Sequence, residues 1–401
     1  MIFIRVFLPF AFGYFLSYAL RVVNAVIHTD LQKDLSLDAA DLGLLTSTYF
    51  LTFAIFQLPL GVLLDRYGPR RTEAALLVIA AAGAILFASA QSVSTLIAGR
   101  ALIGLGVSAC LMGAFKAFVM WFPRERIPVM NGYQMTAGGL GALIATAPVE
   151  AALNFTDWRG VFYAFAALTF AAAVAIYLMV PEKQSEQPVE SHGKQLGEMI
   201  SVFSDPRFLR IAPLAVMSQA SFLSIHGLWA GPWLRDIGGL SRGETANALM
   251  LITIALIAGF LTMGHLTSFL QRHGFRPATV AVTAMSLFMG VQVMLALNVT
   301  VAIIPIWMLF GFTASSGVLC YALLTHSFPT NLAGRVVTAL NLPVFVIAFA
   351  GQWGTGLIIN LWPVAADGGY HPQGYQVGFG LLLGLQVIAL FWYLFYGKAR
   401  D

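Results

Sequence analysis

Three basic side chains lie inside long apolar stretches of this chain, and they are the residues best suited to bind a charged group. Arg21, Arg100 and Lys116 are each flanked by runs of hydrophobic residues. A cation in the hydrocarbon region of a membrane is costly unless it faces a water-filled cavity or a partner. Each of the three therefore predicts either contact with a polar solute or a structural ion pair.

Arg21 belongs to a stripe of polar residues on one face of the first apolar segment. The stripe recurs at helical spacing and consists of Tyr14, Ser17, Tyr18, Arg21, Asn24 and His28. Two interpretations of Arg21 remain open: it binds a solute together with Tyr18 and Asn24, or it forms an ion pair with Glu150 in the fifth segment. Asn24, as a neutral amide, suits a hydrogen bond to a neighbouring helix equally well.

The other two embedded cations share the fourth segment. Arg100 lies in LIAGRALIGLG, where spaced glycines favour a structural or conformational role over solute binding. Lys116 lies near the end of the segment, so its long stem either snorkels to the lipid headgroups or points into a cavity. If Arg21 and Lys116 line one cavity, the site is electropositive and its solute is an anion.

Further candidate contacts are amides and aromatic rings at helical spacing. In the second half of the chain they are Gln219, Phe222, His226, Trp229 and Trp233, then Asn341, Phe345 and Gln352. In the first half they are Thr46, Tyr49, Phe53 and Gln57 on the second segment and Gln134 on the fifth. Such stripes supply hydrogen bonds and flat walls to a small organic solute. Ordinary helix packing is the alternative for each residue.

The composition indicates a polytopic membrane protein. Hydrophobic residues make up 59% of the chain, charged residues 10%, and the mean hydropathy is +0.80, whereas charged residues make up about a quarter of a soluble domain. The net charge of +4 is explained by basic loops beside apolar spans, so no nucleic-acid partner is expected. Cys110 and Cys320 both lie in apolar runs, which excludes a disulfide framework and a zinc site. No metal or cofactor is predicted.

Apolar windows long enough to cross a bilayer predict an all-α integral membrane fold of twelve transmembrane helices. They begin near Phe7, Asp41, Thr72, Leu96, Pro128, Gly160, Phe208, Thr245, Ala278, Val301, Val336 and Gln376. The chain is expected to form two pseudo-symmetric six-helix bundles, residues 1–180 and 208–401, joined by a polar cytoplasmic linker, residues 181–207. Within the linker, Lys194 to Phe203 is either an interfacial helix or part of a flexible tether. FPRER at Phe122 recurs as FPTNLAGR at Phe328, which supports two related halves.

The distribution of basic residues predicts the orientation. Of the 22 Lys and Arg residues, the side that holds both termini has fifteen, and the other side has only Lys33, Arg159, Arg235 and Arg242. Basic residues accumulate in cytoplasmic loops. We therefore expect both termini in the cytoplasm, in a bacterial inner membrane.

A charged hinge joins the second and third segments. The string GVLLDRYGPRR contributes Gly61, Asp65, Arg66, Gly68, Arg70 and Arg71. It resembles the signature between the second and third helices of the major facilitator superfamily, and only Pro69 departs from that pattern. The spans, the linker and the fourth-segment pattern around Arg100 extend the resemblance over essentially the whole chain. It implies a secondary transporter that works by alternating access, functions as a monomer, and uses the hinge residues and Arg100 as a conformational gate.

The resulting hypothesis is a transporter of a small anionic organic solute. The alternative is a proton antiporter that exports drugs or amphipathic compounds, although the fifth segment lacks the Gly-Pro pair expected of such exporters. A sensor that binds without translocating is a third possibility. An enzyme is not expected, because the chain has no phosphate-binding loop, HExxH helix or CxxC pair.

The coupling ion is left open by the sequence. Carboxylates are scarce in the predicted membrane interior, because Asp41 and Glu150 lie near the outer ends of their segments. If a proton is the coupling ion, the candidates are Glu150 and His226, because an unperturbed histidine has a pKa near 6.5 and Glu150 is one of the few carboxylates close to the predicted membrane interior. Proton symport, anion exchange and facilitated diffusion all remain compatible with these residues.

Overall fold

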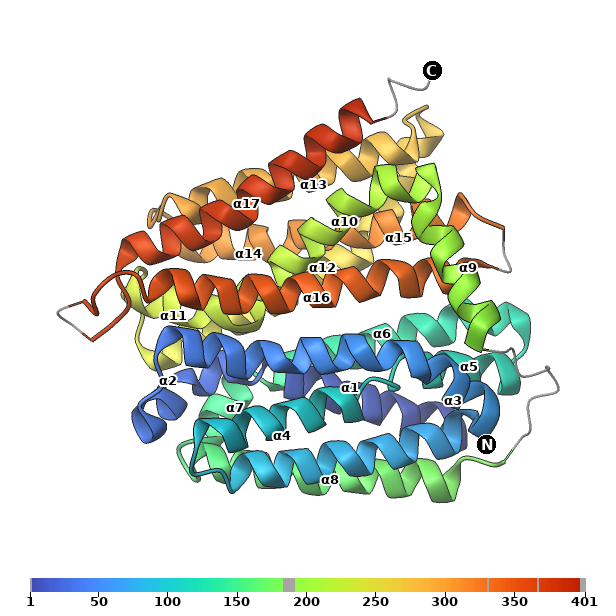
Figure 1. Cartoon of the computed structure of the whole chain (residues 1–401), viewed down its shortest axis with the longest axis horizontal. Helices are drawn as coiled ribbons and strands as arrows, with labels where there is room; N and C mark the ends of the chain where they lie inside the picture. The colour runs from blue at the N-terminus through green and yellow to red at the C-terminus, as the bar shows by residue number, and fades with distance from the viewer. Residues whose placement is uncertain (1, 183–191, 330–331, 366–367, 397–401) are drawn as a thin grey trace. The chain divides into compact units, whose positions relative to one another are not determined.

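The computed structural model describes residues 2–182, 192–329, 332–365 and 368–396. The chain divides into two compact units, Met1–His192 and Gly193–Asp401. In the described residues of both units the regular structure is helical (Figure 1). The central part of the predicted linker, residues 183–191, lies outside the described residues.

The first unit is built from eight α-helices and two short helices of other types. Their bounds are η1 (Phe3–Phe7), α1 (Leu8–Val22), α2 (Asn24–Leu35), α3 (Ala39–Ala88), α4 (Val93–Gly106), α5 (Met112–Trp121), η2 (Arg124–Arg126), α6 (Ile127–Ile144), α7 (Ala147–Ala152) and α8 (Trp158–Met179). Within it α3 packs against both α4 and α8, and α1 packs against α6 and α8.

The second unit repeats this pattern after α9 (His192–Ser204), which begins at its boundary. Its helices are α10 (Pro206–Ser224), η3 (Ile225–Trp229), α11 (Ala230–Asp236), α12 (Arg242–Arg272), α13 (Pro277–Ala296), α14 (Ile303–Ala314), α15 (Gly317–His326), α16 (Ala333–Ile359) and α17 (Pro372–Phe395). Met199 and Val202 of α9 are buried with Phe208 in the core of this unit. Burial of its apolar side explains why the end of the linker is helical.

Local sequence signals set where the helices begin. Asp38 accepts a hydrogen bond from the backbone of Asp41 at the start of α3, and Asp157 accepts one from Gly160 at the start of α8, both at 2.8 Å. Ser241 and Glu244 form a reciprocal capping box on α12. Such side chains bind the backbone N–H groups that a first helical turn leaves unpaired.

Nine helical segments among the described residues are long and apolar enough to cross a membrane. One of them, α3, contains two passes that meet at Gly68, and α4 with α5 and α6 with α7 supply two more as interrupted helices. The described helices therefore account for the twelve predicted passes. Their starts agree with the predicted ones within a few residues, as expected when hydropathy alone sets the span.

The fourth pass is interrupted in its middle, and side-chain amides from neighbouring helices donate hydrogen bonds to backbone carbonyls at the interruption. Residues 107–111 between α4 and α5 are turns. Gln57 of α3 donates to the carbonyl of Ser108 at 3.3 Å, and Gln134 of α6 donates to that of Cys110 at 3.3 Å and to that of Phe10 at 3.2 Å. Exposed backbone carbonyls are not tolerated in lipid, so an interruption needs such partners.

A polar clamp joins α2 to α8 near one end of the first unit. The Asp34 carboxylate accepts a hydrogen bond from Trp158 Nε1 at 2.8 Å and pairs with Arg159 at 2.6 Å. Arg159 also donates to the carbonyl of Ala90 at 3.3 Å. The hydrogen bonds from Trp158 and Arg159 hold the pKa of the Asp34 carboxyl below its usual range.

Removal of this clamp should produce a small, pH-dependent loss of stability. Asp34→Ala leaves the buried indole N–H of Trp158 without its acceptor, and we expect a loss of about 1 kcal/mol, because the pair is partly exposed. The lowered pKa means that the contribution is complete above the ordinary carboxyl value and is lost as the pH falls below about 4. Thermal unfolding in detergent should therefore show a difference between the proteins at neutral pH that shrinks in acid. An equal difference at both pH values would contradict this assignment.

Candidate functional site

The guanidinium of Arg21 lies among aromatic rings inside the first unit. Its central carbon is 4.3 Å from the ring centre of Tyr18, 5.6 Å from that of Tyr49 and 5.5 Å from that of Phe53. Tyr18 precedes it on α1, whereas the other two rings come from α3. The residue is only 8% exposed. The stripe predicted on α1 thus contacts the stripe predicted on the second segment.

Tyr49 organises this cluster, which we call the Arg21 cluster and define as Ser17, Tyr18, Arg21, Tyr49 and Phe53. The Tyr49 hydroxyl donates to the carbonyl of Ser17 at 3.1 Å and accepts from Arg21 Nε at 3.5 Å. These bonds leave the flat face of the guanidinium against rings, where cation–π attraction holds it. The cluster therefore places a permanent positive charge in the membrane-spanning part of the unit.

Arg100 approaches Tyr49 from another side. Its guanidinium carbon is 5.5 Å from the Tyr49 ring centre, and one terminal nitrogen donates to the carbonyl of Leu20 at 2.6 Å. Arg100 is fully buried, and its Nε has no hydrogen-bond partner among the described residues. This contact joins α4 to the end of α1, so a structural or conformational role for Arg100 has a physical basis.

Two other predicted solute contacts in this unit bind neighbouring helices. Asn24 donates to Thr46 Oγ1 at 3.1 Å, which ties α2 to α3. Gln134 donates to the two backbone carbonyls described above. Each retains a buried side-chain oxygen that has no hydrogen-bond partner in the part of the chain that the structure describes, Asn24 Oδ1 and Gln134 Oε1.

Lys116 forms an ion pair with Asp65 of the hinge. The two side chains are 20% and 34% exposed, respectively. The pair links α5 to the segment of α3 that precedes Gly68, and Gly68 has φ 75° and ψ 164°. Only glycine adopts these angles without strain, which explains the glycine in the hinge string. Thr72 bonds the carbonyl of Leu63 at 3.1 Å across this turn.

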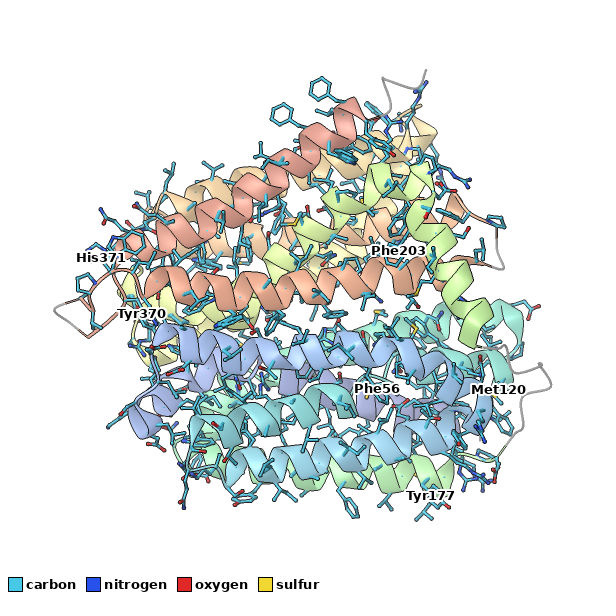
Figure 2. The ribbon with its side chains drawn as sticks, viewed as in Figure 1. Phe56, Met120, Tyr177, Phe203, Tyr370 and His371 are labelled. Atoms are coloured by element: carbon cyan, nitrogen blue, oxygen red, sulfur yellow. The ribbon has the colours of Figure 1, made fainter. Side chains whose placement is uncertain are left out.

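The hinge arginines hold the end of α8. Arg70 donates to the carbonyl of Tyr177 at 2.8 Å and lies 4.9 Å from the centre of its ring. Figure 2 labels Tyr177 near the end of α8. Arg70 and Arg71 also pair with Glu182, which follows that helix. Arg66 instead lies over the ring of Tyr67 at 5.3 Å.

A charge exchange tests the energetic coupling between Asp65 and Lys116. We expect Asp65→Asn and Lys116→Met each to lower the unfolding temperature in detergent, and the double variant to lose less than the sum of both. The coupling should be about 1 kcal/mol, as for partly exposed ion pairs. The reversed pair Asp65→Lys with Lys116→Asp should recover part of the loss. Strict additivity of the single variants would show that the pair contributes no interaction energy.

The second unit has its own polar and aromatic cluster at the π-helix η3. Trp229 donates from Nε1 to the carbonyl of Gln352 at 2.9 Å, and the Gln352 amide donates to the carbonyl of Ser224 at 3.4 Å. Gln219 lies against Gly317, at the start of α15, and Asn341 accepts a hydrogen bond from Tyr321 at 2.6 Å. A π-helix often occurs at functional positions.

The two predicted coupling residues lie in different units. His226 is buried beside Thr253 Oγ1, 3.5 Å from its Nε2, and stacks on Phe222 with ring centres 5.0 Å apart. Glu150 lies in the short helix α7 and is half-buried.

One buried carboxyl group, that of Glu73, was not identified from the sequence. The predicted third span begins near Thr72, which puts Glu73 at its edge. The structure instead continues α3 around it and buries it completely, where the thiol of Cys110 is the one polar side chain that interacts with its carboxyl group among the described residues. Glu73 is therefore a buried carboxyl that the sequence analysis did not count among the few carboxylates of the membrane interior. A single glutamate beside a hinge gave no periodic signal that could have revealed its burial.

The chemistry of the site is that of binding. In the part of the chain that the structure describes, no group of three or more His, Cys, Asp or Glu side chains could hold a metal ion. Each unit presents hydroxyls, amides and aromatic rings, and the first adds the Arg21 charge. These groups can recognise a polar solute reversibly.

Comparison with known families gives one extended match. The model described as Major Facilitator Superfamily matches residues 10–352. Among solved structures, a bacterial homolog to the human lysosomal transporter Spinster, in an inward-facing and occupied conformation, has a TM-score of 0.78 and 17% identity. The alignment covers 98% of this chain and 96% of that chain. At this identity the likeness concerns the fold alone.

Two relatives illustrate the range of similar sequences. The nitrate/nitrite transporter NrtP of Picosynechococcus is 32% identical over 131 residues, 33% of this chain and 24% of the relative. The chain thus spans about a quarter of the length of that relative. A protein of Escherichia coli K12 named as a probable L-galactonate transporter is 22% identical over 376 residues, 87% of this chain and 81% of the relative.

Proposed function

Because the chain belongs to the major facilitator superfamily, we propose that it is a secondary transporter of a small organic anion and that Arg21 recognises the negative charge. The proposal rests mainly on one observation: a guanidinium inside a membrane-spanning unit, surrounded by the rings of Tyr18, Tyr49 and Phe53. A cation is retained at such a position when it serves a solute or an ion pathway.

The chemistry of arginine suits this role. A guanidinium offers a planar set of donors that matches a carboxylate or a related oxyanion, and it keeps its charge when buried. In the Arg21 cluster the rings restrict its orientation, so little rotamer freedom is lost on binding. The hydroxyl group of Tyr18 supplies a further donor for the oxygens of the same solute, whereas that of Tyr49 already donates to the carbonyl of Ser17.

The names of two similar proteins are compatible with this proposal. One is called a nitrate/nitrite transporter and the other a probable L-galactonate transporter, so both names refer to anions. Both similarities are distant, and the solute of this chain is proposed on the Arg21 geometry. Asn24, Gln134 and Lys116 are proposed as further solute contacts of the first unit. For the second unit, considered by itself, the proposed solute contacts are Gln219, His226, Trp229, Asn341 and Gln352.

We also propose that the protein lies in a bacterial inner membrane as a monomer with both termini in the cytoplasm. The excess of basic residues on the side of the termini supports this orientation. The hinge residues and Arg100 are proposed to act as the conformational gate. Their contacts connect α3 with α5 and α8, and α4 with α1.

A thermal-shift screen on the detergent-purified protein tests the proposed solute class. The screen compares pooled carboxylates and sulfonates with sugars, amino acids and hydrophobic cations. A ligand present at 100 times its Kd stabilises the folded protein by about 2.7 kcal/mol. We expect stabilisation by anions, followed by counterflow of the same compound in proteoliposomes. Stabilisation by hydrophobic cations alone would favour the amphipathic-compound exporter, and binding without counterflow would favour a sensor.

A further inference from the structure

Glu73 is a buried carboxyl group at the meeting point of three helices. It lies on α3 with no exposed surface, and among the described residues its oxygens meet the weakly polar thiol of Cys110 and no stronger hydrogen-bond donor. An isolated carboxylate ion transferred to such surroundings would lose its hydration without compensation, whereas the neutral acid loses far less. The packed arrangement therefore requires a proton on Glu73.

Two glycines make the space that the carboxyl group occupies. A Cβ atom added at Gly13 of α1 would lie 3.0 Å from Glu73 Oε1, and one added at Gly113 of α5 would collide with Glu73 Oε2. Both helices thus lack a side chain where the carboxyl group lies. The acid is enclosed by their backbones, and separation of either helix from α3 would admit water to it.

The surrounding titratable groups leave the charge of a carboxylate unbalanced. Cys110, in the break between α4 and α5, is the titratable group that interacts with the Glu73 carboxyl among the described residues, and its neutral thiol offers a weak hydrogen bond but no positive charge. Tyr14 follows Gly13 on α1 but directs its hydroxyl to the sulfur of Met135. Lys116 follows Gly113 on α5 and is paired with Asp65. On α8, the neighbour at the level of Gly13 is Ile176.

We propose that Glu73 is a proton-binding site whose occupancy depends on the packing of α1 and α5 against α3. The acid holds its proton while these helices enclose it and releases the proton when water reaches it. The use of this site in a transport cycle rests on the proposed transport function, but the proton binding itself does not. Within such a cycle, the site would couple proton binding to helix movement.

Infrared spectroscopy of the purified protein tests the protonation directly, with the proton as the only ligand. We expect a carbonyl stretch of a neutral carboxylic acid near neutral pH, where ordinary carboxyls are ionised. This band should disappear in Glu73→Gln and persist in Glu125→Gln, which removes an exposed glutamate of η2. A band that is absent from the wild type, or that survives in Glu73→Gln, would overturn the proposal.

The pH dependence of stability gives a second, independent measurement. Because the folded protein would bind one more proton than the unfolded chain at neutral pH, its stability should fall as the pH rises. Between about pH 5 and about pH 8, the ratio of folded to unfolded wild-type protein should fall by up to a factor of ten per pH unit relative to the same ratio for Glu73→Gln. Glu125→Gln should follow the wild type.

The possible results of this titration separate the proposal from its alternatives. Coincident pH profiles for wild type and Glu73→Gln would overturn it. Stabilisation by Na⁺ at fixed pH that is lost in Glu73→Gln would also overturn it, because it would assign a metal cation to the carboxylate. Both experiments are done without an organic solute. Their results therefore test proton binding by Glu73 even if the proposal of anion transport is wrong.

Discussion

Arg21→Gln should strongly weaken recognition of the transported anion while leaving the protein folded. Glutamine keeps a hydrogen-bonding side chain of intermediate length but removes the charge that we propose faces the solute. Loss of one partner of a buried, hydrogen-bonded charge pair costs about 2 kcal/mol or more. The affinity should therefore fall about 30-fold or more. Ligand-induced thermal stabilisation and proteoliposome uptake of the same anion measure this change.

Two variants control for general effects of removing a cation. Arg21→Lys keeps the charge but loses the planar donor set and its stacking on Tyr18, so it should retain weak binding. Arg276→Gln removes an exposed arginine just before α13 and should leave binding unchanged. If Arg21→Gln transports the anion as well as wild type, Arg21 has a structural role and the anion proposal is wrong.

Gly141→Ala should destabilise the first unit strongly. Gly141 lies on α6 where that helix contacts the backbone of α1. A Cβ atom there would collide with the carbonyl oxygen of Phe15 and lie 2.7 Å from its carbonyl carbon. Because a backbone group cannot rotate away, α1 and α6 must separate. Overpacking typically costs about 1–3 kcal/mol, and we expect the upper end of that range. Thermal unfolding in detergent, followed by size-exclusion chromatography, measures the loss.

A glycine on the same helix provides a matched control of opposite sign. A Cβ atom at Gly132 meets nothing within 4 Å. Gly132→Ala should therefore leave packing intact and raise stability by about 0.5–1 kcal/mol, because alanine favours the helix. If both variants shift the unfolding temperature equally, the close approach of α1 and α6 does not limit stability.

Hydropathy and composition were sufficient to predict the membrane-spanning helices of this chain. Long apolar runs must form hydrogen-bonded helices in lipid, so the sequence places the spans without tertiary information. The interruption of the fourth pass, by contrast, was not predicted from the sequence. The spaced glycines around Arg100 favoured a structural or conformational role, and only the structure shows that Gln57 and Gln134 donate to the carbonyls of Ser108 and Cys110.

The candidate site also has a part that the sequence predicts and a part that only the tertiary structure shows. The helical spacing of Tyr18 and Arg21 placed both residues on one face, and the structure adds Tyr49 and Phe53 from α3 beside the guanidinium. Lys116 could not be assigned from sequence, because its length permits several partners. Its pairing with Asp65 depends on how α5 approaches the hinge.

The sequence by itself determined the membrane class, the spans, the charged hinge and the polar face of Arg21. These features follow from local composition and periodicity, which act over neighbouring residues. The tertiary structure decided which helix each polar group meets, and it enclosed Glu73 between Gly13 and Gly113. Burial of a single carboxyl depends on the approach of helices distant in sequence, and no local pattern encodes that approach.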